Sequence, residues 1–192
     1  MAFFVGGKEL DIWVDLGGGA QSSATTHVDF AWDSFRSDGY RIFKVYITDL
    51  WLTDGYKFEV AFLTANNAVP SIGMYGGAFA HGEADADVAD YDVKWNNQAR
   101  IPVSANQGSA ALSGTYRGNF EFTVNTGDNA ASGVPNYWWH GTMRLGSTLA
   151  SHIAGGGTCT QNARYGIRMT TSGPTANHLL RMRYKVLGMK NA

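Results

Sequence analysis

The sequence has little of several features that would narrow its function. Cys159 is the single cysteine among 192 residues, so no internal disulfide can form and stability must come from packing or assembly. Charged residues make up 16% of the chain, with a formal net charge of −1, so there is no strong positive field to gather nucleic acid or an anionic membrane. We therefore expect neither nucleic-acid binding nor membrane insertion.

Long apolar runs and familiar catalytic motifs are also missing. No stretch approaches the length of a transmembrane helix, and the opening MAFFVGGKEL lacks the apolar core of a signal peptide. The chain contains no GxSxG, HExxH or GxxxxGK pattern, and its five histidines lie far apart in sequence. We expect a non-enzymatic protein, without a cofactor, that is made soluble inside a cell.

Two-residue alternation takes the place of helical periodicity. In residues 40–64, YRIFKVYITDLWLTDGYKFEVAFLT, apolar side chains recur at every second position on both sides of Asp54-Gly55. We interpret this stretch as a hairpin of two core strands, because Asp-Gly suits a tight turn. The 24 glycines and the Ser, Asn and Ala tracts are typical of many short strands joined by loops.

The remaining chain predicts about ten strands in all. A first strand at 10–16 is expected to end at Gly17-Gly18-Gly19, and the others are expected near 24–30, 93–95, 100–103, 115–125, 137–145, 163–170 and 179–189. We interpret 33–39, 65–82 and 146–160 as loops, with one edge strand near 72–75. Residues 1–9 are expected to be a short arm, and 10–192 a single all-β domain, a two-sheet antiparallel β-sandwich of jelly-roll type.

Alternation also predicts which side chains face the core. Tyr137 and Trp139 are expected to point inward and Trp138 outward, while Leu180 is expected to face inward in the last strand. Outward Glu59 and Glu121 could serve as the carboxylate pair of a glycosidase. The preferred interpretation is that each pairs with a cation on a neighbouring strand.

An acidic segment, EADADVADYD at 83–92, offers the strongest metal-like pattern. Asp85 and Asp87 resemble the start of a calcium-binding loop, but the glycine at the sixth position and the terminal glutamate are missing. A solvated acidic loop is therefore the preferred interpretation, with calcium as the alternative.

Exposed aromatic residues are the best binding candidates. Trp138 with His140 and Arg144, and Trp51 at the end of its strand, offer indole faces that suit the C–H face of a sugar ring. The same residue types concentrate in subunit interfaces, which is the preferred interpretation. The six tryptophans exceed the needs of one core, which supports either role.

Several motifs together resemble a family of small β-sandwich virion proteins of tailed bacteriophages. They are the entry Val28-Asp29-Phe30, the stretch 40–64, the strand SGTYRGNFEFTV at 113–124 and the closing RMRYKVLGMK. The resemblance covers most of residues 27–190. The chain departs from the family in having Val186-Leu187-Gly188 where Leu-Tyr-Gly is usual, and in lacking a long N-terminal attachment segment.

This resemblance implies a structural component of the virion, made in the host cytoplasm. It would be a tail-fibre, receptor-binding or capsid-decoration protein that assembles as a homotrimer and either binds host surface glycan or decorates the particle. The arm at residues 1–9 would dock on other virion proteins. A free-standing lectin-like carbohydrate-binding module is the alternative, and a polysaccharide hydrolase is the third hypothesis.

Overall fold

The computed structural model describes most of the chain as β-strands. The described residues are 4–5, 8–9, 13–53, 56–70, 73–83, 91–103, 116–127, 135–145, 149–159, 165–172 and 177–190. Within them only the backbone is described for 4–5, 8–9, 79–83, 91–95, 102, 116–117, 143–145 and 149–151. No helix in the described part is long and apolar enough to cross a membrane.

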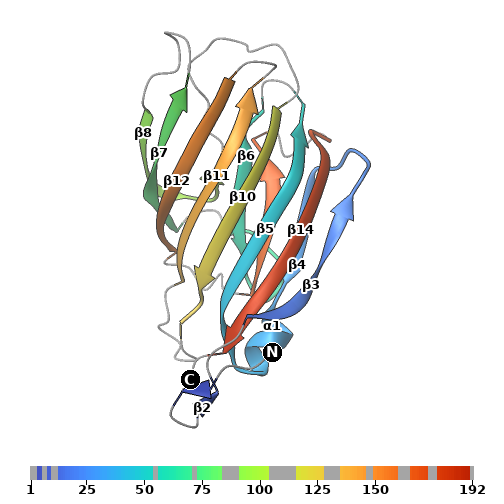
Figure 1. Ribbon diagram of the computed structural model, residues 1–192, viewed down its shortest axis with the longest axis vertical. Coiled ribbons are helices and arrows are strands. Elements are labelled where there is room, and N and C mark those ends of the chain that lie inside the picture. The colour runs from blue at the N-terminus through green and yellow to red at the C-terminus, as the bar shows by residue number, and fades with distance from the viewer. Residues whose placement is uncertain are drawn as a thin grey trace.

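The larger of two antiparallel sheets has eight strands. In spatial order these are β3 (Val14–Gln21), β14 (Leu179–Lys190), β5 (Tyr40–Leu52), β10 (Tyr116–Asn125), β11 (Asn136–Leu145), β12 (Leu149–Cys159), β7 (Met74–Glu83) and β8 (Tyr91–Gln98) (Figure 1). Each inner strand pairs with a neighbour on both sides, so the sheet presents one continuous outer face.

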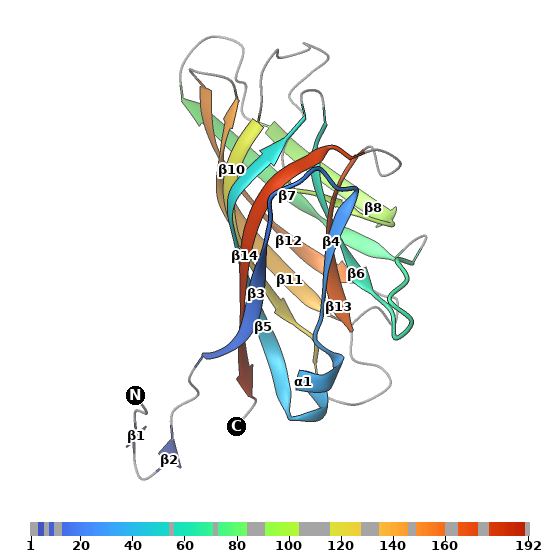
Figure 2. The ribbon, with the colours of Figure 1, turned by 90° about the vertical axis from the view of Figure 1, so that its right-hand side faces the viewer.

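A four-stranded sheet forms the second layer. Its order is β4 (His27–Ala31), β13 (Gly166–Thr171), β6 (Phe58–Leu63) and β9 (Ile101–Pro102). Figure 2 shows the two layers edge-on, with the short helix α1 (Asp33–Ser37) at one end. A separate pair, β1 (Phe4–Val5) and β2 (Lys8–Glu9), lies in the expected arm. The prediction of an all-β, two-sheet antiparallel sandwich is confirmed.

Eight of these strands pair in a nested order. The first of the eight along the chain pairs with the eighth, the second with the seventh, the third with the sixth and the fourth with the fifth. Within the set β3, β4, β5, β6, β9, β10, β13 and β14, the antiparallel pairs are β3 with β14, β4 with β13, β5 with β10 and β6 with β9. The remaining four strands, β11, β12, β7 and β8, extend the larger sheet beyond β10. The larger sheet is therefore twice as wide as the smaller one, and this width creates its broad outer face.

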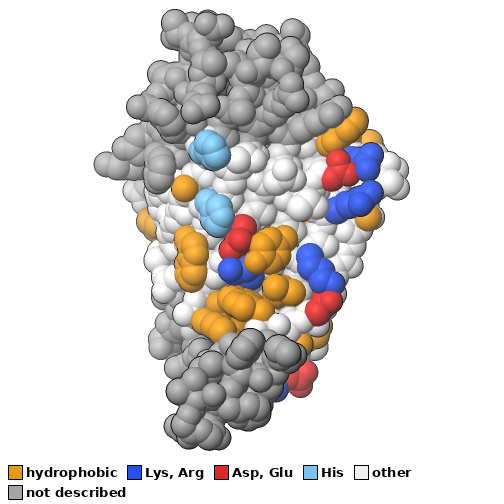
Figure 3. Space-filling view, viewed as in Figure 1, with side chains coloured by type: hydrophobic (Ala, Val, Ile, Leu, Met, Phe, Trp, Pro, Cys, Tyr) orange, Lys and Arg blue, Asp and Glu red, His pale blue; other side chains and the backbone are white. Residues whose placement is uncertain are grey.

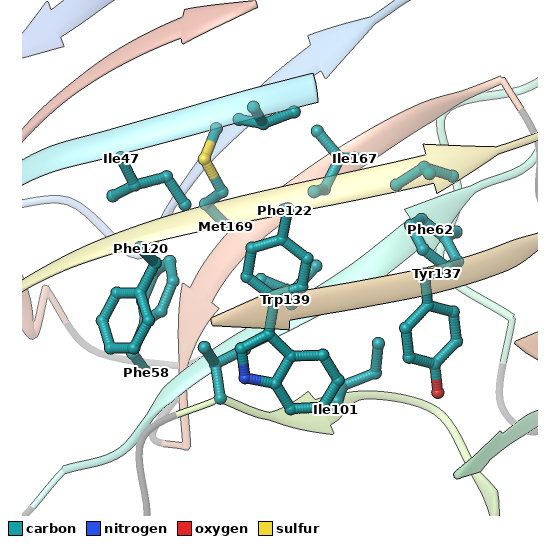
Figure 4. Close-up of a cluster of buried hydrophobic side chains, with 14 of the residues drawn as sticks. Ile47, Phe58, Phe62, Ile101, Phe120, Phe122, Tyr137, Trp139, Ile167 and Met169 are labelled. Carbon is teal, nitrogen blue, oxygen red and sulfur yellow. The ribbon is translucent and has the colours of Figure 1, made fainter. Parts of the chain in front are cut away.

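Aromatic side chains fill the space between the sheets. Phe122 and Trp139 stack with ring centroids 5.4 Å apart, and Phe58 stacks on Phe120 at 5.8 Å across the two layers (Figure 4). Trp139 is only 2% exposed, whereas its neighbour Trp138 is 49% exposed. The predicted inward and outward faces of β11 are confirmed at these two positions.

The predicted hairpin at 40–64 is wrong. β5 belongs to the larger sheet and β6 to the smaller one, so the segment between Leu52 and Phe58 crosses from one layer to the other. Both strands bury one face in the same core, and their alternation is therefore the same as that of a hairpin. The proposed turn, Asp54-Gly55, lies outside the described residues.

Two predictions about glycine-rich segments are also wrong. Gly17-Gly18-Gly19 lies within β3 instead of ending a strand, and Gly155-Gly156-Gly157 lies within β12 where a loop was expected. A Cβ on Gly155 would come within 2.5 Å of the Trp139 ring, and one on Gly157 within 2.7 Å of the Tyr137 hydroxyl. These positions are glycine because bulky neighbours occupy the space of a side chain.

Three further segments differ from expectation. β7 is an interior strand between β12 and β8, not an edge strand in a loop. Residues 33–37, expected to be a loop, form α1. In β14 the register shifts after Leu179 and again after Arg181, so Leu179 and Met182 are buried while Leu180 is only half-buried. Each shift breaks the two-residue alternation on which the prediction for Leu180 depended.

Candidate functional site

An open concavity of about 470 Å³ lies on the outer face of the larger sheet. We call it the outer concavity. Its outward-facing side chains are Tyr46 and Thr48 from β5, Asn119 and Glu121 from β10, His140 and Thr142 from β11, and His152 and Ala154 from β12. Figure 3 shows this face, with histidine side chains near a pair of opposite charges and hydrophobic side chains around them. The lining offers hydroxyl, amide, carboxylate and imidazole groups within one cavity.

A bulge shapes one wall of the outer concavity. The register between β5 and β10 shifts between Gly118 and Phe120, and Asp49 adopts a positive φ of 55° at this point. The Asp49 backbone N–H donates to Asn119 Oδ1 at 3.1 Å. Because this bond occupies the amide oxygen, the Asn119 NH₂ group remains to donate toward a ligand. Bulges commonly re-aim side chains in this way at binding sites.

An ion pair holds the carboxylate that β10 contributes to the lining of the outer concavity. Lys44 Nζ lies 2.8 Å from Glu121 Oε1, and both side chains are mostly shielded. The ammonium also lies 5.0 Å from the Trp13 ring centroid and 5.9 Å from that of Tyr46. The hydrogen bond to Glu121 raises the pKa of Lys44 above its usual value. The pair therefore holds the Glu121 carboxyl group in place at the cavity.

Trp138 stands beside the outer concavity on the same face of β11 as His140. The two residues are separated by two positions, or roughly 7 Å along the strand. Across the sheet, Trp138 lies opposite Thr123 on one side and Gly156 on the other. Gly156 has no side chain to cover the indole, which is consistent with its 49% exposure. The exposed indole face therefore adjoins a mainly apolar cavity that carries a few polar groups.

Trp51 and Arg144 lie at the other end of the strands. Arg117 of β10 is opposite both of them, so all three fall on one row of the sheet. Trp51 is half-buried, and the Arg181 guanidinium lies 5.6 Å from its ring centroid. Arg181 is itself held by Asp49 through Nε and Oδ2 at 2.6 Å. The Arg144 side chain lies outside the described residues, and the structure does not group this row with Trp138 and His140.

The metal-like and carboxylate candidates are resolved only in part. Asp85 and Asp87 lie outside the described residues, so the calcium alternative stays open. Within the described residues, no group of three or more His, Cys, Asp or Glu side chains is placed to hold a metal ion. Cys159 is fully buried.

Glu59 and Glu121 do not face each other. They belong to different sheets, and each has a cation nearby, Arg100 at 3.6 Å from Glu59 and Lys44 at 2.8 Å from Glu121. Their pairing as the two carboxylates of a glycosidase is therefore wrong.

Several residues of the outer concavity were not among the sequence candidates. His152 was missed because 146–160 was interpreted as a loop, and Asn119 and Thr142 are ordinary polar residues on strands. The alternation of Ile153 inward with His152 and Ala154 outward could have revealed the strand. The bulge at Asp49 has no sequence signal that we recognise.

Comparison with known proteins gives no match for this chain among family models, curated proteins or solved structures.

Proposed function

We propose that this chain is a structural protein of a tailed-phage particle that binds host surface glycan through the outer face of its larger sheet. The observation that carries the proposal is the outer concavity of about 470 Å³ beside the exposed indole of Trp138. Within the phage particle the protein would act as a short fibre, a receptor-binding tip or a decoration of the capsid surface, and it would assemble as a homotrimer.

The nested strand pairing supports this class of protein. We include in the proposal that the eight nested strands form a jelly roll. In a jelly roll, eight strands in two four-stranded layers pair in this nested order, and here the layers are β3, β14, β5 and β10 in one sheet and β4, β13, β6 and β9 in the other. Jelly rolls occur in viral capsid proteins and in lectins. Both of the leading hypotheses, virion protein and lectin-like module, therefore fit the same topology. Because other β-sandwich proteins can share this topology, support for glycan binding must come from the surface of the larger sheet.

The outer concavity combines a mainly apolar lining with a few polar groups, a mixture that suits the C–H faces and hydroxyls of a sugar. Its volume falls within the roughly 300–1,000 Å³ range of ligand sites, and its polar groups approach from four strands. Sugar hydroxyls can accept from the Asn119 amide and donate to Glu121, while the C–H face of a neighbouring sugar can stack on Trp138. The C–H groups of the same sugar can contact the apolar part of the lining.

A glycan array with purified protein tests this proposal. We expect binding by the natural chain and a loss of about tenfold or more in the Trp138→Ala variant, equivalent to about 1.4 kcal/mol. Val14→Ala is the matched control, because Val14 is an exposed hydrophobic residue in β3 of the same sheet and does not line the cavity. Absence of glycan binding, or equal binding by Trp138→Ala, would refute the proposal.

A second role for the same face is contact between copies of the chain. Trp138 and the hydrophobic side chains in Figure 3 lie on a sheet face that no other described strand or helix covers, and aromatic residues are enriched in interfaces. Light scattering separates the two roles: a trimer that dissociates in Trp138→Ala places the interface on this face, whereas a trimer unchanged in that variant leaves the face for glycan. A monomer that binds glycan would favour the free-standing lectin-like module.

A further inference from the structure

Two histidines of the outer concavity have no partner among the described residues. His140 and His152 are both exposed, and neither makes a hydrogen bond, ion pair or ring contact within that part of the chain. Two histidines elsewhere in the described part do: His27 contacts Thr26 Oγ1 at 2.8 Å, and His178 stacks on Tyr56 with centroids 3.3 Å apart. The two imidazoles in the cavity therefore keep both ring nitrogens available to a ligand.

Strand register places these two imidazoles next to each other on one face. His140 lies opposite Ala154, and His152 lies opposite Thr142, so they are diagonal neighbours on β11 and β12. Diagonal neighbours in an antiparallel pair are roughly 7–8 Å apart. A small group bound between the two rings can therefore reach both.

The surrounding charges leave room for an anion at this point. Among the described residues, Glu121 is the carboxylate that lines the cavity. It lies opposite His140, and Lys44 balances its charge at 2.8 Å. The phenol of Tyr46 is the other titratable group from β5, and Lys185 lies opposite Tyr46 on β14, where it is bound to Asp15. On β7, His81 lies opposite His152, although its side chain is outside the described residues.

We propose that the glycan bound here is acidic, and that its carboxylate lies between His140 and His152 while an adjoining sugar stacks on Trp138. This inference rests on the proposed glycan-binding function. Imidazole gains its proton between about pH 8 and pH 5, and a protonated ring donates from both nitrogens. Binding therefore tightens as the pH falls, and a neutral glycan does not show this dependence.

Titration calorimetry with the full chain tests the inference at pH 5.5 and pH 7.5. The probes are a uronic-acid oligosaccharide, a sialylated oligosaccharide and the carboxyl-reduced counterpart of each. We expect at least one acidic probe to bind fivefold or more tightly at pH 5.5 than at pH 7.5. His140→Gln and His152→Gln should each abolish that pH dependence, whereas His27→Gln, in the smaller sheet, should retain it.

The possible results separate the two proposals. Binding of the reduced probes as tightly as the acidic ones, still lost in Trp138→Ala, overturns the acidic ligand and leaves the glycan-binding function intact. Binding of the acidic probes that does not change with pH also overturns the inference. No binding of any probe, together with a negative glycan array, overturns both proposals. Unchanged unfolding temperatures in the histidine variants exclude misfolding as the cause of a loss.

Discussion

The adjacent tryptophans of β11 provide a stringent test of the strand register. Trp139 is 2% exposed and stacks between Phe122 at 5.4 Å and Tyr137 at 6.0 Å, whereas Trp138 is 49% exposed. Trp139→Ala leaves a large cavity in the core, so we expect a cost of about 3–5 kcal/mol in unfolding free energy. Trp138→Ala removes a side chain from the surface, and we expect a change of about 0.5 kcal/mol or less.

Urea unfolding measured by circular dichroism gives both free energies on the same scale. For a chain of this size the loss in Trp139→Ala corresponds to a fall in unfolding temperature of roughly 6–20 °C. Glycan binding should respond in the opposite way, with the large loss in Trp138→Ala. An unfolding free energy reduced more by Trp138→Ala than by Trp139→Ala would show that the faces of β11 are reversed, because a one-residue slip exchanges every side chain between them.

Three further predictions concern the packing and the ion pairs. Gly157→Ala places a Cβ 1.9 Å from the Tyr75 carbonyl oxygen, which also accepts a hydrogen bond from the Tyr137 hydroxyl, so thermal unfolding should show a loss of about 1–3 kcal/mol. Burial raises the pKa of Glu59 above its ordinary value of 4.5, although Arg100 acts in the opposite direction. The stability that the protonated Glu59 contributes is therefore full below pH 4.5 and is lost as the pH rises through the pKa of the folded state. Glu59→Gln should therefore gain unfolding free energy relative to the natural chain between pH 4 and pH 7 in urea titrations, and a relative loss would contradict the burial argument. Arg168 binds both oxygens of Asp29 at 2.8 and 2.7 Å, so Arg168→Met should cost about 1 kcal/mol in the same titrations. Lys185→Met, at a far more exposed pair, should cause no measurable change.

The all-β sandwich was predictable because apolar residues at every second position indicate a strand with one buried face. Phe120, Phe122 and Val124 recur at every second position, and all three are buried in the structure. The same signal could not assign β5 and β6 to their sheets, since both bury one face against a shared core. Alternation therefore predicts which residues face inward, but not which layer a strand joins.

Glycine was the main source of error in assigning strands. Gly155 and Gly157 were taken to indicate a loop, yet they occupy β12 opposite Trp139 and Tyr137, whose rings fill the space. This packing depends on residues from another strand, so it is not visible in the local sequence. The error also hid His152, one of the two imidazoles central to the proposed site.

The candidate site was predictable only where it lies on one strand. Trp138 and His140 are two positions apart in β11, and alternation places them on one face. Trp51 belongs to the same outer face but lies at the other end of the strands, under Arg181. Grouping His140 with His152, Asn119 and Glu121 required the pairing of three strands and the bulge at Asp49.

The most direct test of the central claim is an NMR titration of the ¹⁵N-labelled chain with the acidic oligosaccharide at pH 5.5. If the outer face of the larger sheet binds glycan, the indole signal of Trp138 and the imidazole signals of His140 and His152 should shift together and saturate. Signals of Trp139 in the core and His27 in the smaller sheet should stay in place. Saturable shifts confined to other residues, or no shifts at all, would contradict the claim.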